Sequence, residues 1–248
     1  MLFYGHEAAF GEVCVKAGKA TASRLRSALW VCALLAAVAA AYVLVRLTGV
    51  TQLWAPTYTD SDYGIEPYVS SYDADGDGLD DQSDIVASAH AYVATKPRYG
   101  SAYYEGGWPD DGRGVCTDVV AYALLGAGYD VRELLYEDVT AHPDGYSIPV
   151  PDANIDYRRV EELYDFFSRN TVALTLDPSA ISEWQGGDIV FFDGHVGVVS
   201  ERRNSRGVPL VIHHERILQL AYEEDILESR PIIGHFRVEG LRMATLLE

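Results

Sequence analysis

One cysteine of the chain lies where a thiol can serve as a nucleophile. Cys116 follows a glycine-rich segment, and apolar residues then recur at helical spacing from Val119 to Leu124. Thr117 or Asp118 can cap this helix, which places Cys116 at its first turn. Unpaired N–H groups and the positive end of the helix dipole stabilise an anion there and lower the pKa of a thiol. We therefore expect Cys116 to be a thiolate nucleophile.

A nucleophile needs a base, and His195 is placed to supply one. It lies between two apolar, β-branched runs that read as strands. A third group must hold the imidazole, and the paired strand offers His213 and His214. Strand alternation sends these two side chains to opposite faces, so spacing alone leaves the choice open. A zinc site of Cys116, His195 and His213 is the chemical alternative, although no CxxC or HExxH spacing supports it.

The acidic segment 73–84 has the spacing of a twelve-residue calcium loop. Gly78 takes the turn at position 6, carboxylates fall at positions 1, 3, 5, 9 and 12, and position 7 supplies a backbone carbonyl. The last position is Asp instead of Glu and Asp80 is acidic, as in the extracellular calcium loops of dockerin-like and thrombospondin-type repeats, which this segment resembles. We expect a structural Ca²⁺, with a solvated acidic turn as the alternative. The ligands would be Asp73, Asp75, Asp77, Leu79, Asp81 and Asp84.

The run 28–45 is uncharged, apolar and about as long as a bilayer's hydrocarbon core. Basic residues precede it and Arg46 alone follows closely, which places the N-terminus in the cytoplasm and the rest of the chain outside. We expect a retained single-pass anchor, and a cleaved signal peptide is the alternative. The expected organisation is a cytoplasmic tail (1–27), a membrane anchor (28–46), a linker (47–72), the calcium loop (73–84) and a hydrolase domain (85–248).

Charge and cysteine positions narrow the function further. The formal net charge is −18, and all but two of the 37 acidic residues follow the apolar run. Such a charge argues against nucleic acid or anionic lipid headgroups as partners. Cys14 and Cys32 precede or lie within the apolar run, so Cys116 is the lone thiol outside the membrane. With no partner there, it is not a disulfide cysteine.

Helical patterns precede strand patterns along the remaining chain. Helices are expected over 85–96, from 116 to 126 or 128, over 131–139 and over about 160–167. Strands are expected over 171–176, 188–193, 195–200, 209–214 and 232–238. Helices followed by adjacent strands predict an α+β fold, with N-terminal helices packed on an antiparallel sheet and the cysteine helix among them.

Several motifs, in their order along the chain, resemble the NlpC-type papain-like cysteine peptidases and amidases of bacterial cell walls. These motifs are the segments 103–107 before Cys116, 187–192, 194–199 and 211–213. Other segments are similar to a bacterial extracytoplasmic family within that group, known mainly as a domain of unknown function. They are 114–120, 151–159, 208–213 and 234–237. The resemblance covers roughly residues 85–238.

This resemblance implies a papain-like α+β fold. The calcium loop and the single transmembrane helix that we expect before this domain lie outside the shared part. It also implies a triad of Cys116, His195 and His213, and so favours His213 over His214. It offers two tyrosines as support for the substrate or the oxyanion: Tyr103 and Tyr104. The matching cell-wall peptidases usually have Asp-Cys-Ser-Gly at the nucleophile, where this chain has Val-Cys-Thr-Asp. Asp118 therefore adds a carboxylate near the thiol, and we expect it, like the two tyrosines, to support the substrate or the oxyanion. The substrate class does not carry over directly.

Together these features predict a membrane-anchored, extracytoplasmic cysteine hydrolase that acts on cell-envelope peptides or amides such as peptidoglycan. The expected cofactor is structural Ca²⁺, with no organic cofactor and no nucleic acid partner. Two other functions stay open at this point. One is a calcium-stabilised binding module on a degenerate papain-like scaffold, and the other is an acyltransferase that works through a thioester on the same cysteine.

Overall fold

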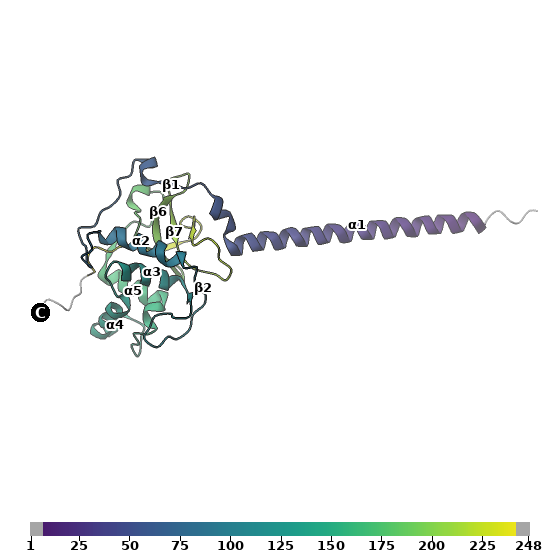
Figure 1. Cartoon of the computed structure of the whole chain (residues 1–248). Coiled ribbons are helices and arrows are strands. Elements are labelled where there is room, and N and C mark those ends of the chain that lie inside the picture. Colours follow the sequence, from purple (N-terminus) through teal and green to yellow (C-terminus); the bar gives the residue numbers. More distant parts are fainter. Residues whose placement is uncertain (1–6, 242–248) are drawn as a thin grey trace, which may run out of the picture. The chain divides into compact units, whose positions relative to one another are not determined.

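A computed structural model describes residues 7–241 of the chain, with side chains described from Arg26 onward. It divides into two compact units, Met1–Arg46 and Leu47–Glu248. Helix α1 (Glu7–Thr48) is continuous (Figure 1). Its segment Arg26–Thr48 has 23 residues and a mean hydropathy of 2.5, long and apolar enough to cross a membrane. A signal sequence has the same properties, so this helix fits either an anchor or a signal. The expected tail with Cys14 lies outside the described side chains.

Four helices of the second unit confirm the helical patterns in the sequence. They are α2 (Asp81–Ala94), α3 (Cys116–Gly126), α4 (Val131–Ala141) and α5 (Val160–Asn170). Helix α2 begins four residues before the expected start because the Asp80 side chain caps it, accepting from the Ser83 backbone N–H. Short 3₁₀ turns lie between these elements: η1 (Val50–Trp54), η2 (Asp60–Tyr63), η3 (Pro143–Gly145), η4 (Asp156–Arg158) and η5 (Ile181–Glu183).

The strands form one antiparallel sheet in the order β4-β9-β5-β6-β7-β8. Strands β5 to β8 are neighbours in sequence order, whereas β9 lies between β4 and β5. Their bounds are β4 (Val172–Ala173), β5 (Ile189–Phe192), β6 (His195–Arg203), β7 (Pro209–Ile212), β8 (Glu223–Glu224) and β9 (Ile232–Arg237). Strand β1 (Tyr58–Thr59) pairs with the far end of β6, and β2 (Arg98–Tyr99) pairs in parallel with β3 (Arg113–Gly114). Gly194, at φ 64°, closes the two-residue turn between β5 and β6.

Helices cover one face of this sheet (Figure 1). Helices α2 and α3 pack on each other and on β6, and α5 packs on β9. Side chains alternate along β5, so that Ile189 and Phe191 join the helices in the main core. Val190 and Phe192 face the other way and pack with Trp184 in a second, smaller core. The fold is therefore α+β with helices on a mostly antiparallel sheet, as the order of patterns predicted.

The expected linker is part of the domain instead. Residues from Leu47 onward belong to the second compact unit, and β1 within them adds to the sheet. Asp60 forms a buried ion pair with Arg203, and the backbone N–H of Tyr68 donates to Gln185 at 2.9 Å. These polar contacts are long-range in sequence. A segment rich in Thr, Tyr, Ser, Asp and Pro therefore looked like a tether when read alone.

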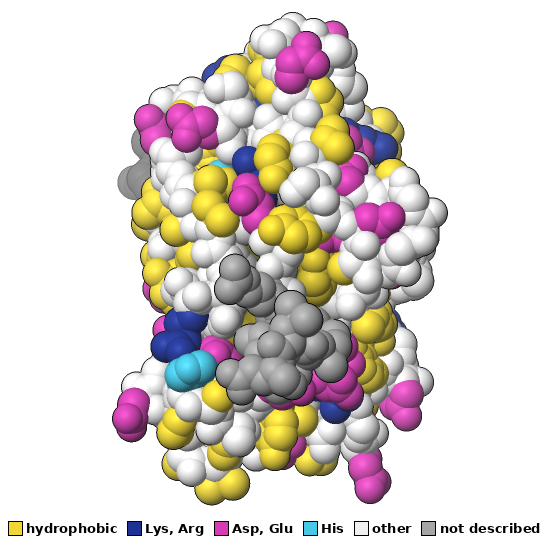
Figure 2. Space-filling view, turned by 90° about the vertical axis from the view of Figure 1, so that its left-hand side faces the viewer, with side chains coloured by type: hydrophobic (Ala, Val, Ile, Leu, Met, Phe, Trp, Pro, Cys, Tyr) yellow, Lys and Arg dark blue, Asp and Glu magenta, His cyan; other side chains and the backbone are white. Residues whose placement is uncertain are grey.

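The surface of the domain is strongly acidic. Figure 2 shows Asp and Glu side chains spread over one face, with few basic side chains among them. This distribution agrees with the net charge of −18 and would repel polyanions.

Candidate active site

Cys116 is the first residue of α3, where a local carboxylate and a distant arginine fix the backbone. The Val115 N–H donates to Asp118 at 2.7 Å. Arg158 donates to both oxygens of Asp118, from Nε and Nη2, at 2.8 Å each. Asp118 is fully buried in this pair. It therefore anchors the start of the helix, and the expectation that its carboxylate faces a substrate gains no support from its contacts.

The thiol of Cys116 is half-buried and neutral in this structure. Burial raises its pKa to about 11, and the negative charge of Asp118 acts in the same direction. Backbone N–H groups of Val196 and Thr117 donate toward the sulfur and lower its pKa, but by less than burial raises it. The structure therefore gives no support to the expectation of a resting thiolate, because packing against β6 removes more water from the sulfur than the helix start can offset.

This neutral thiol has a measurable consequence. We expect the rate of Cys116 alkylation by iodoacetamide to rise about tenfold per pH unit between pH 7 and 10, because only the thiolate reacts. The measurement is labelling followed by mass spectrometry, in a chain carrying Cys14→Ser and Cys32→Ser. The same chain with Cys116→Ala gives the background. A rate that is already level below pH 7 would show that the thiolate forms despite its burial.

His195 and His213 form a hydrogen-bonded pair on neighbouring strands. His195 begins β6, His213 directly follows β7, and His195 Nε2 lies 3.0 Å from His213 Nδ1. Both rings are buried. Gly197 lies between them, and a Cβ there would come within 3.2 Å of His213 Cβ. Burial first, and then the proximity of His213, lowers the pKa of His195 to about 3. His195 is therefore neutral near pH 7, with a ring lone pair available, although a pKa this low makes the ring a weak base in the substrate-free protein.

Spacing had left the choice between His213 and His214 open, and in the structure it is His213 that pairs with His195. His214 turns away and packs edge-on against Tyr99 and Tyr222, with ring centroids 5.3 and 5.0 Å apart. Cys116 lies beside the same strand end, because the backbone N–H of Val196, the residue after His195, donates to its sulfur. Among the described residues the thiol shares no hydrogen bond with the His195 ring. Catalytic contacts of this kind often tighten only when substrate is bound.

Two carboxylates and two arginines surround the histidine pair, and the sequence analysis did not include them. Arg230 donates to Glu215 at 2.6 and 3.0 Å. Burial opposes ionisation of Glu215, but the bonds from Arg230 and the nearby His195 hold its pKa at about 2. Glu224 lies 3.8 Å from His213 Nε2 and pairs with Arg216. The position of Glu215, two residues after His213, was the one hint available, whereas Glu224 belongs to a two-residue strand without a pattern.

The two predicted tyrosines hydrogen-bond elsewhere. The Tyr103 hydroxyl donates to Asp152 at 3.2 Å, and the Tyr104 hydroxyl donates to Asp111 at 3.0 Å. Tyr99 is the tyrosine near the thiol. Its pKa is raised by burial first and then by the charges of Cys116 and Glu215, so its hydroxyl lies within electrostatic range of both.

Three groups of side chains in the described part of the chain could hold a metal ion. In each, the candidate ligand atoms lie within 4.8 Å of one another. The groups are His195 with His213 and Glu215, His90 with Glu201 and Glu223, and Asp73 with Asp75 and Asp77. Cys116, which the zinc alternative required, is not a member of the histidine group.

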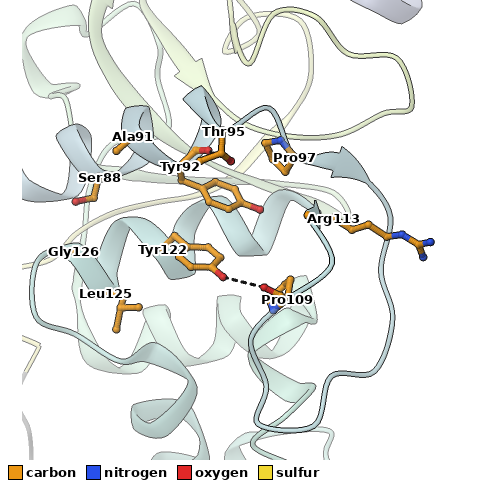
Figure 3. A pocket seen from close by; sticks show the side chains of 11 residues that line it. Ser88, Ala91, Tyr92, Thr95, Pro97, Pro109, Arg113, Tyr122, Leu125 and Gly126 are labelled. Atoms are coloured by element: carbon orange, nitrogen blue, oxygen red, sulfur yellow. Dashed lines mark hydrogen bonds between the residues drawn. The ribbon is translucent and has the colours of Figure 1, made fainter.

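A cavity of about 500 Å³ lies between α2, α3 and the loop that precedes Cys116 (Figure 3). The rings of Tyr92 and Tyr122 stack on one another there, with centroids 4.6 Å apart. The Tyr122 hydroxyl donates to the Pro109 carbonyl at 3.5 Å, as Figure 3 shows. Cys116, His195 and His213 are not among the residues that line this cavity, so it is separate from the candidate active site.

The fold and site define an α+β domain with a helix-start cysteine beside a buried histidine pair. Residues 86–238 match the family described as Domain of unknown function (DUF1287), and the chain belongs to this family. It is similar to the uncharacterized protein YijF of Escherichia coli (strain K12), with 39% identity over 152 residues. That match spans 57% of this chain and 72% of YijF. No solved structure matches the chain significantly. The family region includes Cys116, His195 and His213, but begins after the loop 73–84.

Proposed function

We propose that this chain is an extracytoplasmic cysteine hydrolase of the papain-like, NlpC type that cleaves amide bonds. The observation that carries this proposal is the 3.0 Å hydrogen bond between His195 and His213, next to a cysteine at the start of a helix. A nucleophile, a base and a group that orients the base are the parts that such chemistry needs.

The neutral thiol and neutral imidazole suit a concerted attack. His195 takes the thiol proton as Cys116 Sγ bonds to the carbonyl carbon of the substrate amide. Val115 N–H is already used by Asp118 and Thr117 N–H donates toward the sulfur, so the oxyanion would take a hydrogen bond from the N–H of Cys116. The C–N bond then breaks, His195 passes its proton to the leaving amine, and the acyl group stays on sulfur as a thioester. Water attacks the thioester, loses a proton to His195, and releases a carboxylic acid and the thiol.

The surroundings of His213 support one assignment of the ring nitrogen that acts as the base. His213 Nε2 is buried without a hydrogen-bond partner in the described structure and faces Glu224 at 3.8 Å. A carboxylate on that side favours a proton on Nε2, which makes His213 Nδ1 an acceptor. His195 must then donate from its Nε2, and its Nδ1 lone pair is left free for the thiol proton. We assign His213 and Glu224 as positioning residues on this ground.

Location and charge point to the substrate class. The apolar helix α1 and the positive-inside tendency support an extracytoplasmic domain with a cytoplasmic N-terminus. The resemblance to cell-wall peptidases points to peptides of the cell envelope, such as peptidoglycan. The acidic surface disfavours nucleic acid. We therefore propose that the enzyme acts on amide bonds of envelope peptides.

Hydrolysis can be tested by following oxygen from water. Purified full-length protein in detergent is incubated with peptidoglycan in water enriched in oxygen-18, and released peptides are analysed by mass spectrometry. We expect wild type to release peptides whose new carboxylate carries the label, and Cys116→Ser to release none. Unlabelled products joined to an added amine would show an acyltransferase instead. Equal release by both proteins, or none by either, would contradict a Cys116-dependent hydrolase of this substrate class.

A further inference from the structure

The loop 73–84, outside the family region, brings three carboxylates to one point. Asp73, Asp75 and Asp77 each offer an oxygen, and these oxygens lie within 4.8 Å of one another. All three side chains are exposed, so the cluster alone is no more than an acidic turn. A second observation is needed to make it a binding site.

Asp84 supplies that observation. It lies in the first turn of α2 and is only 8% exposed, yet its Oδ2 is buried without a hydrogen-bond partner. A buried, unpaired carboxylate oxygen is costly unless something positive meets it. Asp84 lies one helical turn after Asp81, on the same face of α2, and Asp81 accepts a hydrogen bond from the Ala74 N–H of the loop, so this face of the helix lies against the loop. A buried carboxylate oxygen without a partner therefore lies beside a cluster of three exposed carboxylates, and no basic side chain offsets them in the described contacts.

Asp81 has a structural role in the loop. Its Oδ1 accepts from the Ala74 N–H at 2.8 Å, and its Oδ2 accepts from the Tyr129 hydroxyl. Both oxygens are thus engaged by donors that include the buried Tyr129 hydroxyl, whereas the oxygens of Asp73 accept only from exposed backbone N–H groups of the loop itself, those of Gly76, Asp77 and Gly78. The expectation that Asp81 is a direct ligand gains no support, and Asp81 instead ties the loop to the residues that follow α3.

We propose that the loop 73–84 binds one Ca²⁺ through the side chains of Asp73, Asp75, Asp77 and Asp84 and the backbone carbonyl of Leu79. Carboxylate and carbonyl oxygens are the ligands of hard cations. Ca²⁺ accepts six to eight oxygens in flexible geometry, whereas Mg²⁺ demands a near-ideal octahedron and keeps several waters. A loop that offers four carboxylates, each able to bind through one or two oxygens, suits the larger ion.

The position of the loop gives the ion a structural role. The loop leads directly into α2, whose start carries Asp84. Gly128, just after α3, approaches the backbone N of Asp75 so closely that a Cβ there would lie 3.0 Å away. A cation would therefore hold the start of α2 against the end of α3, the helix that begins with Cys116. This role is independent of the proposed hydrolase activity.

The test is thermal unfolding of the full-length protein in detergent with EGTA, CaCl₂ or MgCl₂, together with calorimetric titration of Ca²⁺. We expect one Ca²⁺ per chain and a rise in Tm of roughly 5–10 °C when free Ca²⁺ is about 100-fold above Kd. MgCl₂ at the same concentration should give a much smaller rise. Asp84→Asn should lose most of the Ca²⁺-induced shift, and should raise Tm in EGTA because the unpaired buried charge is gone.

Asp75→Asn, at an exposed position, provides a second variant that does not depend on changing a buried residue, and it should also lose most of the shift. Asp110→Asn removes the same charge from an exposed residue far along the chain and should keep the wild-type response. A wild-type Tm that is equal in EGTA and CaCl₂ would overturn the proposal. Equal Ca²⁺-induced shifts in wild type and Asp75→Asn would do the same.

Discussion

His195→Gln is expected to lower the rate of peptide release by roughly 10³-fold while the protein stays folded. The magnitude follows from the thiol. With a pKa of about 11, only about 10⁻⁴ of Cys116 is ionised at pH 7 unless a base takes its proton. Glutamine can replace the hydrogen bond to His213 but cannot accept a proton. The rate should be measured at saturating peptidoglycan, with folding checked by circular dichroism.

Two comparisons make this result specific. His142→Gln changes an exposed histidine on the helical side of the domain and should leave the rate within about twofold of wild type. Cys116→Ala should lose at least as much activity as His195→Gln, and the double variant should be no worse than Cys116→Ala, because residues that act as one unit are not additive. A His195→Gln protein that retains a third or more of the wild-type rate would remove His195 from the mechanism.

The parts of the site that follow from local pattern could be predicted from the sequence. The helix start at Cys116, the strand that begins with His195 and the acidic loop all depend on neighbours within a few residues. Periodicity and turn residues report such neighbours directly. Strand parity could not decide between His213 and His214, because the choice depends on the register between β6 and β7 and on the room that Gly197 leaves.

The remaining features depend on contacts between distant residues. The thiol pKa follows from packing of α3 against β6, and helix position alone gave the opposite sign. Asp118 read as a possible substrate contact until Arg158, forty residues later, was found to hold both of its oxygens. The segment 47–72 read as a tether because its partners, such as Arg203, are more than a hundred residues away. No local pattern encodes such pairs.

Asp188→Ala is expected to cost about 3–5 kcal/mol of the free energy of unfolding, a large share of the roughly 5–15 kcal/mol typical of a domain. Asp188 is fully buried just before β5. Arg237 donates to both of its oxygens at 2.8 Å, and His235 Nε2 lies 3.0 Å from its Oδ2. Gln82 of α2 donates to it as well, at 2.9 Å. Removing the carboxylate would leave these buried donors unpaired, including one full charge.

Urea unfolding of the full-length protein in detergent gives the free energy, and Asp193→Ala is the matched control. Asp193 is five residues further along the same hairpin and exposed, so its loss should cost less than about 0.5 kcal/mol. A cost below about 1 kcal/mol for Asp188→Ala would contradict the account of the network.

This comparison also bears on catalysis, because Asp188 touches neither Cys116 nor the histidine pair in the described contacts. Activity lost in Asp188→Ala should return at lower temperature as the folded fraction recovers, whereas activity lost in His195→Gln should not.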